Sequence, residues 1–184
     1  MPLFFHELSH LVLSLLVGFV IWKKWHKHIG VFITALLGGV FIDLDHLIDY
    51  ILAFGTKFNL IFFLKGYQFL KTDKIYVPLH SWELVIILLL TSIFLLSNLK
   101  TRKGNLSFRA KGEKSRSAIR FVPILLLTFS LSLFLHLSVD VFTNNMLPQS
   151  YSLIYRMQNN FYLKRLVAPS HYQKHLKQKK QLFF

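Results

Sequence analysis

The sequence contains no cysteine, and this absence excludes several classes of site. Disulfides, thiolate nucleophiles, and zinc or iron–sulfur centres built on cysteine are all ruled out. Any metal must be held by histidine, carboxylates, backbone groups or water. The motif G-x-S-x-G is also missing, so serine hydrolysis of the nucleophile-elbow type is disfavoured.

Acidic residues are scarce. The chain has eight Asp and Glu against 22 Lys and Arg, which gives a formal net charge of +14, and 53% of its residues are hydrophobic. The basic residues lie mainly in polar stretches between apolar blocks, as they do when they set membrane topology and meet anionic lipid. We therefore expect membrane lipid as a partner. The rival reading of this charge, nucleic-acid binding, needs a specific cause that the sequence does not supply.

Alternating strand patterns are absent, whereas long apolar blocks are present. Crossing about 30 Å of hydrocarbon takes roughly 20 residues. The sequence predicts an all-α, multi-pass transmembrane helical bundle with about four spanning helices. The first block is short unless residues 2–7 join its helix, and it lacks the basic segment of a cleavable signal peptide. The predicted spans cover residues 8–22, 29–54, 79–99 and 121–144.

The chain is expected to divide into a transmembrane domain, residues 1–144, and a basic, partly interfacial tail, residues 145–184, with Tyr151 and Tyr155 in the interface. The segments 23–28 and 97–120 are strongly basic, so the positive-inside rule places both in the cytoplasm. The connection 55–78 would then face outward. The lysines of the tail argue against this orientation.

Six of the eight acids lie inside or at the edges of apolar blocks. A charged side chain at the centre of a span costs roughly 2.5–3.5 kcal/mol, so this placement indicates function. The acids concerned are Glu7, Asp43, Asp45, Asp49, Glu83 and Asp140.

Each predicted span pairs a histidine with a second histidine or a carboxylate at helical spacing, as in His6/His10 and His136/Asp140. In an antiparallel bundle the ends that carry these pairs share one side of the membrane, and such convergence is how bundles build metal sites. We predict one or two divalent metal ions, with zinc first and manganese or iron as alternatives. The predicted ligands are His10, Asp43, Asp45, His46, His80, His136 and Asp140.

Other polar residues have simpler interpretations. An isolated histidine in a span is more often hydrogen-bonded to a neighbour than a ligand. The alternatives for His6 and Glu83 are interfacial groups or partners behind the ligands, and for Asp49 a helix-end residue. Gly38 and Gly39 predict close helix packing. The histidines expected to be solvated in basic stretches are His26, His28, His171 and His175.

The same residues carry a family resemblance. His10 lies in SHLVLSLLVG, the block FIDLDH supplies Asp43 to His46, His80 lies in PLHSWELV, and FLHLSVDVFT supplies His136 and Asp140. In this order the segments resemble a bacterial and archaeal family of membrane-bound, metal-dependent hydrolases typified by a LexA-regulated inner-membrane protein. The resemblance implies hydrolysis at the prokaryotic cytoplasmic membrane. Two features depart from the family pattern: Ile42 replaces a proline, and a His-Arg pair is missing before His80.

The leading functional hypothesis is a metal-dependent hydrolase of a phosphoester in a lipid or lipid-linked molecule, with its site on the extracytoplasmic side. Its catalytic residues would be Asp43, Asp45, His80 and Asp140, one carboxylate serving as general base for the metal-bound water. The first alternative is a transporter or metal-ion permease using the same cluster. The second is an interaction protein whose basic segment 101–120 binds anionic lipid or nucleic acid.

Overall fold

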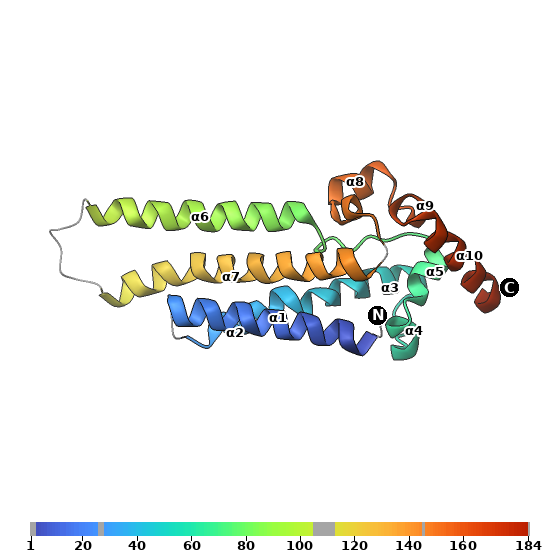
Figure 1. Ribbon diagram of the computed structural model, residues 1–184, viewed down its shortest axis with the longest axis horizontal. Coiled ribbons are helices and arrows are strands. Elements are labelled where there is room, and N and C mark those ends of the chain that lie inside the picture. Colours follow the sequence, from blue (N-terminus) through green and yellow to red (C-terminus); the bar gives the residue numbers. More distant parts are fainter. Residues whose placement is uncertain (1–2, 26–27, 105–112, 145, 184) are drawn as a thin grey trace. The chain divides into compact units, whose positions relative to one another are not determined.

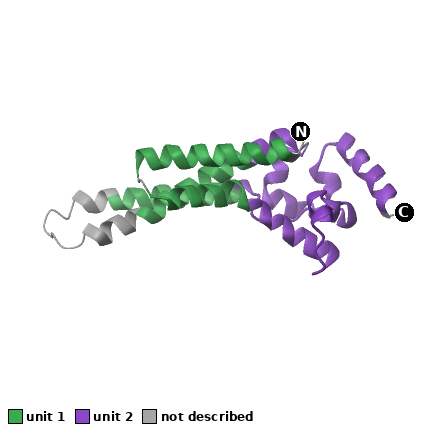
Figure 2. Cartoon of the chain, turned by 90° about the horizontal axis from the view of Figure 1, so that it is seen from below, with its two compact units in different colours: residues 1–41, 83–136 green, residues 42–82, 137–184 purple. Residues whose placement is uncertain are grey.

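The computed structural model describes residues 3–25, 28–104, 113–144 and 146–183, with side chains described for 4–25, 28–99, 121–144 and 146–182. These parts of the chain are helical and contain no strand, only isolated bridges such as Met146 with Val167. The predicted all-α fold class is therefore confirmed. The chain forms two compact units, residues 1–41 with 83–136 and residues 42–82 with 137–184, which Figure 2 colours separately.

Long apolar helices dominate the first unit and run along one another (Figure 1). Apolar side chains at Ile21, Val31 and Ile124 form a core cluster there. The α1 helix ends on Lys23 and Lys24, whose charges complement the negative end of the helix dipole. The helices that lie wholly or largely in this unit are α1 (Leu3–Lys24), α2 (Gly30–Gly39), α6 (Trp82–Gly104) and α7 (Glu113–Thr143).

Three helices of the described chain are long and apolar enough to cross a membrane, and a fourth span results if one bent pair is counted. The single helices are Phe4–Lys24, Trp82–Leu99 and Phe121–Thr143. The bent pair, Gly30–Gly39 with Phe41–Phe54, turns by 52°. The four apolar blocks of the sequence thus become helices, and residues before Leu8 do extend the first one.

Close packing in the first unit depends on small residues. A Cβ on Gly38 would lie 2.7 Å from the backbone oxygen of Phe129, so α2 and α7 approach one another at that point. Ser132 Oγ on α7 donates to the carbonyl of Ala35 on α2 at 2.7 Å. The predicted role of Gly38 and Gly39 in close helix packing is confirmed.

The second unit consists of short helices and turns around its own apolar cluster, which includes Ile75, Val77 and Leu166. The connection 55–78, which the sequence predicts as a loop, contains two α-helices. The described part of the tail, residues 146–183, contains three α-helices. The elements are the 3₁₀ turn η1 (Phe41–Asp45), α3 (His46–Phe54), α4 (Leu60–Leu64), α5 (Tyr67–Thr72), the 3₁₀ turn η2 (Pro148–Tyr151), α8 (Leu153–Gln158), α9 (Leu163–Leu166) and α10 (Pro169–Phe183).

The secondary structure and burial of several polar segments also differ from what the sequence predicts. The basic stretch 97–120 is helical at both ends, since α6 runs to Gly104 and α7 begins at Glu113, and residues 105–112 lie outside the described residues. His175, expected to be solvated, is buried and bonded to Asp73 at 2.8 Å. Tyr151, expected in the interface, is also buried. His26 lies outside the described residues.

Candidate metal centre

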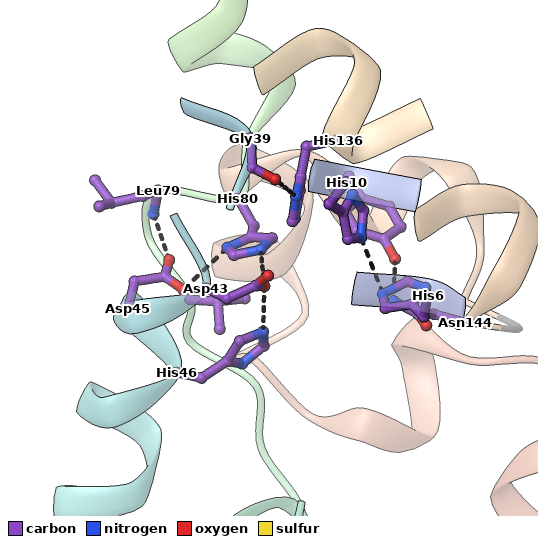
Figure 3. Close-up of polar contacts among 12 residues, drawn as sticks. His6, His10, Gly39, Asp43, Asp45, His46, Leu79, His80, His136 and Asn144 are labelled. Atoms are coloured by element: carbon purple, nitrogen blue, oxygen red, sulfur yellow. Dashed lines mark hydrogen bonds and ion pairs between the residues drawn. The ribbon is translucent and has the colours of Figure 1, made fainter. Parts of the chain in front are cut away.

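Three of the predicted ligands, Asp43, His46 and His80, meet within the second unit (Figure 3). His80 Nε2 lies 3.1 Å from Asp43 Oδ1, and His46 Nε2 lies 3.5 Å from the same oxygen. One ligand atom from each residue lies within 4.8 Å of the others, which suits a single ion. The helix break explains the local placement, because Asp43 sits in the 3₁₀ turn and His46 opens α3.

Asp45 occupies the other side of His80. Its Oδ1 lies 2.9 Å from His80 Nδ1, and its Oδ2 accepts the backbone N–H of Leu79 at 2.9 Å. Because the Asp45 carboxylate can only accept a hydrogen bond from His80 Nδ1, that nitrogen carries a proton, and the ring is oriented with Nε2 towards Asp43. The structure therefore places Asp45 against the predicted ligand His80, on the side away from Asp43, and carboxylates in this position orient metal-binding histidines.

The two carboxylates beside His80 favour positive charge at this position. Burial acts to lower the pKa of His80, but the hydrogen bonds and charges of Asp43 and Asp45 outweigh burial and raise this pKa to about 10. The donor set of one carboxylate and two imidazoles is one that zinc, manganese or iron accepts, and three protein ligands leave room for water or substrate. These residues therefore fit a divalent metal ion.

The backbone segment that presents His80 is held from both directions. The carboxylate of Asp49 accepts the N–H groups of Tyr76 at 2.8 Å and Val77 at 3.1 Å. The guanidinium of Arg156 donates to the carbonyls of Tyr76 at 2.7 Å, Val77 at 2.8 Å and His80 at 2.7 Å. Asp49 thus has a structural role that helix-end placement alone did not indicate.

Arg156 is the residue that sequence reasoning missed. It is 1% exposed, although it belongs to a basic tail in which most cations are expected to be solvated. The available signal was its setting in LIYRMQ, where an arginine interrupts a largely apolar stretch. That signal does not reveal which carbonyls the guanidinium will meet, because they lie about 80 residues earlier in the chain.

The first unit gathers His6, His10 and His136 (Figure 3). His10 Nε2 lies 3.0 Å from His6 Nε2, and the rings of His10 and His136 stack with centroids 3.9 Å apart. His136 Nδ1 lies 3.0 Å from the carbonyl oxygen of Gly39, so this nitrogen donates and the neutral ring keeps Nε2 as its electron-pair donor. His10 and His136 are thus a buried pair of imidazoles within their own unit.

Asp140 is buried in the second unit and acts on Tyr151. Burial raises the pKa of the Tyr151 hydroxyl, and the charges of Asp140 and Asp43 raise it further. Asn144 Nδ2 donates to this hydroxyl at 3.4 Å. Tyr151 is therefore a neutral hydroxyl in the surroundings of two predicted site residues. The convergence of all seven predicted ligands in one centre stays a prediction.

The fold and the site define a class: an all-helical chain with three to four candidate membrane spans and buried His and Asp groups able to hold a metal ion. No family model, curated protein or solved structure matches the chain. The resemblance to membrane-bound metal-dependent hydrolases therefore stays a prediction.

Proposed function

We propose that the chain is an integral membrane hydrolase that binds a divalent metal ion through Asp43, His46 and His80 and cleaves a phosphoester of a lipid. The observation that carries this proposal is the cluster itself, with one ligand atom from each of three residues within 4.8 Å. A carboxylate within an apolar block is costly to place in a membrane, which supports a functional reason for keeping Asp43 in the block 29–54.

The residues of the second unit have separate roles in this scheme. Asp43, His46 and His80 hold the ion, which supplies Lewis acidity and a bound water of lowered pKa. Asp45 orients His80 through Nδ1. Asp140 is a candidate general base, and Tyr151, kept protonated by its surroundings, is able to donate a hydrogen bond to a phosphoryl oxygen.

Metal analysis of the full chain purified in mild detergent tests the binding step. We expect about one equivalent of zinc, manganese or iron per chain, because three ligands of this type form one site. Asp43→Asn and His80→Gln should lose most of it. Asp73→Asn is the matched control, since that carboxylate of the same unit pairs with Lys179 and His175, and its loss should loosen α10 without changing the metal content. Equal metal content in all variants would reject the site, with tryptophan fluorescence verifying that each is folded.

Hydrolysis is tested separately, by phosphate release from phosphatidic acid in mixed micelles with the metal-loaded protein. Release that depends on Asp43 supports the proposal. Metal binding without release from this and other lipid phosphoesters would reject the hydrolase and leave the metal site standing.

One observation favours a second candidate, a metal-ion permease. The ligands Asp43 and His46 follow directly after the break of a helix pair bent by 52°, and transporters often build ion sites on broken helices. Zinc or manganese flux into proteoliposomes, abolished by Asp43→Asn and without phosphoester hydrolysis, would select this function over the first.

A further inference from the structure

The α4 helix forms an apolar projection on the second unit. Its sequence is LIFFL and none of its residues is buried. Leu60 is 58% exposed, Ile61 61% and Leu64 53%, whereas Phe63 turns inward to pack on Tyr50 with ring centroids 6.0 Å apart. Exposed leucine and isoleucine side chains in consecutive positions call for a partner that covers them.

The projection is held rigidly by the unit beneath it. Tyr50, which is buried, donates its hydroxyl to the carbonyl of Lys57 at 3.2 Å and accepts the N–H of Asn59 at 2.8 Å. Asn59 in turn caps α4 by accepting the N–H of Phe62 at 3.1 Å. The apolar face is therefore part of an ordered structure with fixed backbone partners.

Several features identify a lipid bilayer as the covering partner. The preceding helix α3 belongs to the bent pair that meets the criteria for a span, and it exposes Ile48, Ile51 and Leu52 in the same unit. The exposed face of α4 continues this apolar character. Lys57 and Lys65 flank α4, as they would if their ammonium groups remained at the level of the headgroups.

A cavity of about 350 Å³ beside Lys65 suits a headgroup. One ammonium and two carboxamides supply donors for phosphate oxygens, two leucines form an apolar wall, and the lining residues among those that the structure describes include no Asp or Glu. The lining residues are Lys65, Tyr67, Leu70, Gln178, Gln181 and Leu182.

We propose that α4 inserts into the interfacial layer of the bilayer and that the adjoining cavity receives the headgroup of an anionic phospholipid. The insertion anchors the unit that carries Asp43, His46 and His80 to the membrane surface. It does not depend on the function of the metal centre, because none of these ligands lies on α4.

The absence of native cysteine allows a direct test by spin labelling of the full chain. Single variants Ile61→Cys, Leu64→Cys and Lys57→Cys are labelled with a nitroxide and reconstituted in phosphatidylcholine vesicles, with or without an equal amount of phosphatidylglycerol. We expect labels at positions 61 and 64 to be reached by oxygen several-fold more than by a water-soluble nickel complex, and the label at position 57 to show the reverse.

Two results would overturn the insertion. One is access of the nickel complex to positions 61 and 64 equal to that at position 57. The other is strong spin–spin broadening at position 61, which would show that a second copy of the chain covers α4.

The headgroup site is tested by the immersion depth of the label at position 61, which phosphatidylglycerol should increase. Lys65→Gln should remove this increase. Lys177→Gln, on the exposed side of α10, should retain it. Equal depth in both lipids would reject the cavity as a headgroup site.

Discussion

His80 is the residue on which the candidate metal centre depends most, because both of its ring nitrogens face carboxylates. These carboxylates come from a stretch of three residues, Asp43 to Asp45, and the backbone N–H of Leu79 fixes the second of them. A histidine that is oriented in this way loses little freedom on binding an ion. A carboxylate that hydrogen-bonds to a metal-binding histidine pre-organises that histidine for the ion.

Replacing Arg156 with methionine should destabilise the second unit and weaken metal binding together. The substitution removes the charged donor from three carbonyls of the segment that ends at His80, at an expected cost of about 3 kcal/mol or more. Thermal unfolding in detergent measures the first effect, and cobalt titration followed by its visible absorption measures the second.

Arg165→Met is the matched control, because Arg165 is an exposed arginine on the neighbouring helix α9. Arg156→Lys should restore part of the stability, since one ammonium can reach fewer carbonyls than the guanidinium fork. Unchanged stability and cobalt affinity in Arg156→Met would show that the carbonyl contacts do not support the site.

At the scale of elements, the break between α2 and α3 places the metal ligands. The pair is bent by 52° at Val40, although the sequence of both helices contains no proline. The break leads into a 3₁₀ turn that carries Asp43 and Asp45, and α3 then begins at His46. A straight helix through this stretch would place successive acids on different faces, so the turn is part of how the site forms.

Gly38→Ala should destabilise the packing of α2 on α7. The new Cβ would meet backbone atoms of Phe129, which cannot move aside without separating the helices, and such overpacking costs roughly 1–3 kcal/mol. This outweighs the gain in helix propensity of about 1 kcal/mol from alanine.

Gly18→Ala serves as the comparison for Gly38→Ala, because its Cβ would mainly meet the ring of Phe32, a side chain that can rotate. Denaturation in mixed detergent micelles should therefore show a lower midpoint for Gly38→Ala than for Gly18→Ala. Equal midpoints would argue against close approach of the two helices.

The docking of α10 should be lost only in strong acid. Burial acts to raise the pKa of Asp73, but the hydrogen bonds and charges of Lys179 and His175 outweigh it and lower this pKa below its ordinary value of 3.8. A depressed folded-state pKa contributes stability that is present above pH 3.8 and is lost as the pH falls through the folded value. The protection of residues 169–183 against hydrogen exchange, relative to the intrinsic exchange rate at each pH, should stay high at neutral pH and fall only well below pH 3.8.

Asp73→Asn supplies the control for this pH dependence. It removes the carboxylate that binds Lys179 and His175, so exchange in α10 should be fast at neutral pH as well. A variant that exchanges like the wild-type protein would show that apolar contacts alone hold the helix.

For the whole molecule, removing the metal should lower thermal stability. An ion that binds only the folded chain stabilises it by about 2.7 kcal/mol when its concentration is a hundred times the dissociation constant. Melting of the detergent-solubilised chain should occur several degrees higher with zinc or manganese than with a chelator. Asp43→Asn should melt at one temperature in both conditions, and the same result for the wild-type chain would contradict the metal site.

Much of the fold follows from composition along the chain. Apolar blocks of sufficient length, few acids and no strand pattern predict membrane-length helices, and each block is helical in the structure. Histidine and aspartate at spacings of three and four predict shared helix faces, and the contact between His46 and Asp43 follows from that spacing. These features are local, so the sequence is sufficient to reveal them.

Other features depend on groups that are distant in the chain. The carbonyl partners of Arg156, the cluster around Asp73 and the N–H groups held by Asp49 join segments separated by 27 to 106 residues. No local pattern distinguishes His175 from the other basic residues of the tail, and the apolar setting of Arg156 does not reveal which carbonyls it meets. Sequence alone determined the membrane-length helices, the scarcity of charge within them and the residue types able to bind a metal, because these depend on local spacing and solvation. The tertiary structure decided which of those residues meet and which cations are buried, because burial depends on the partners that folding supplies.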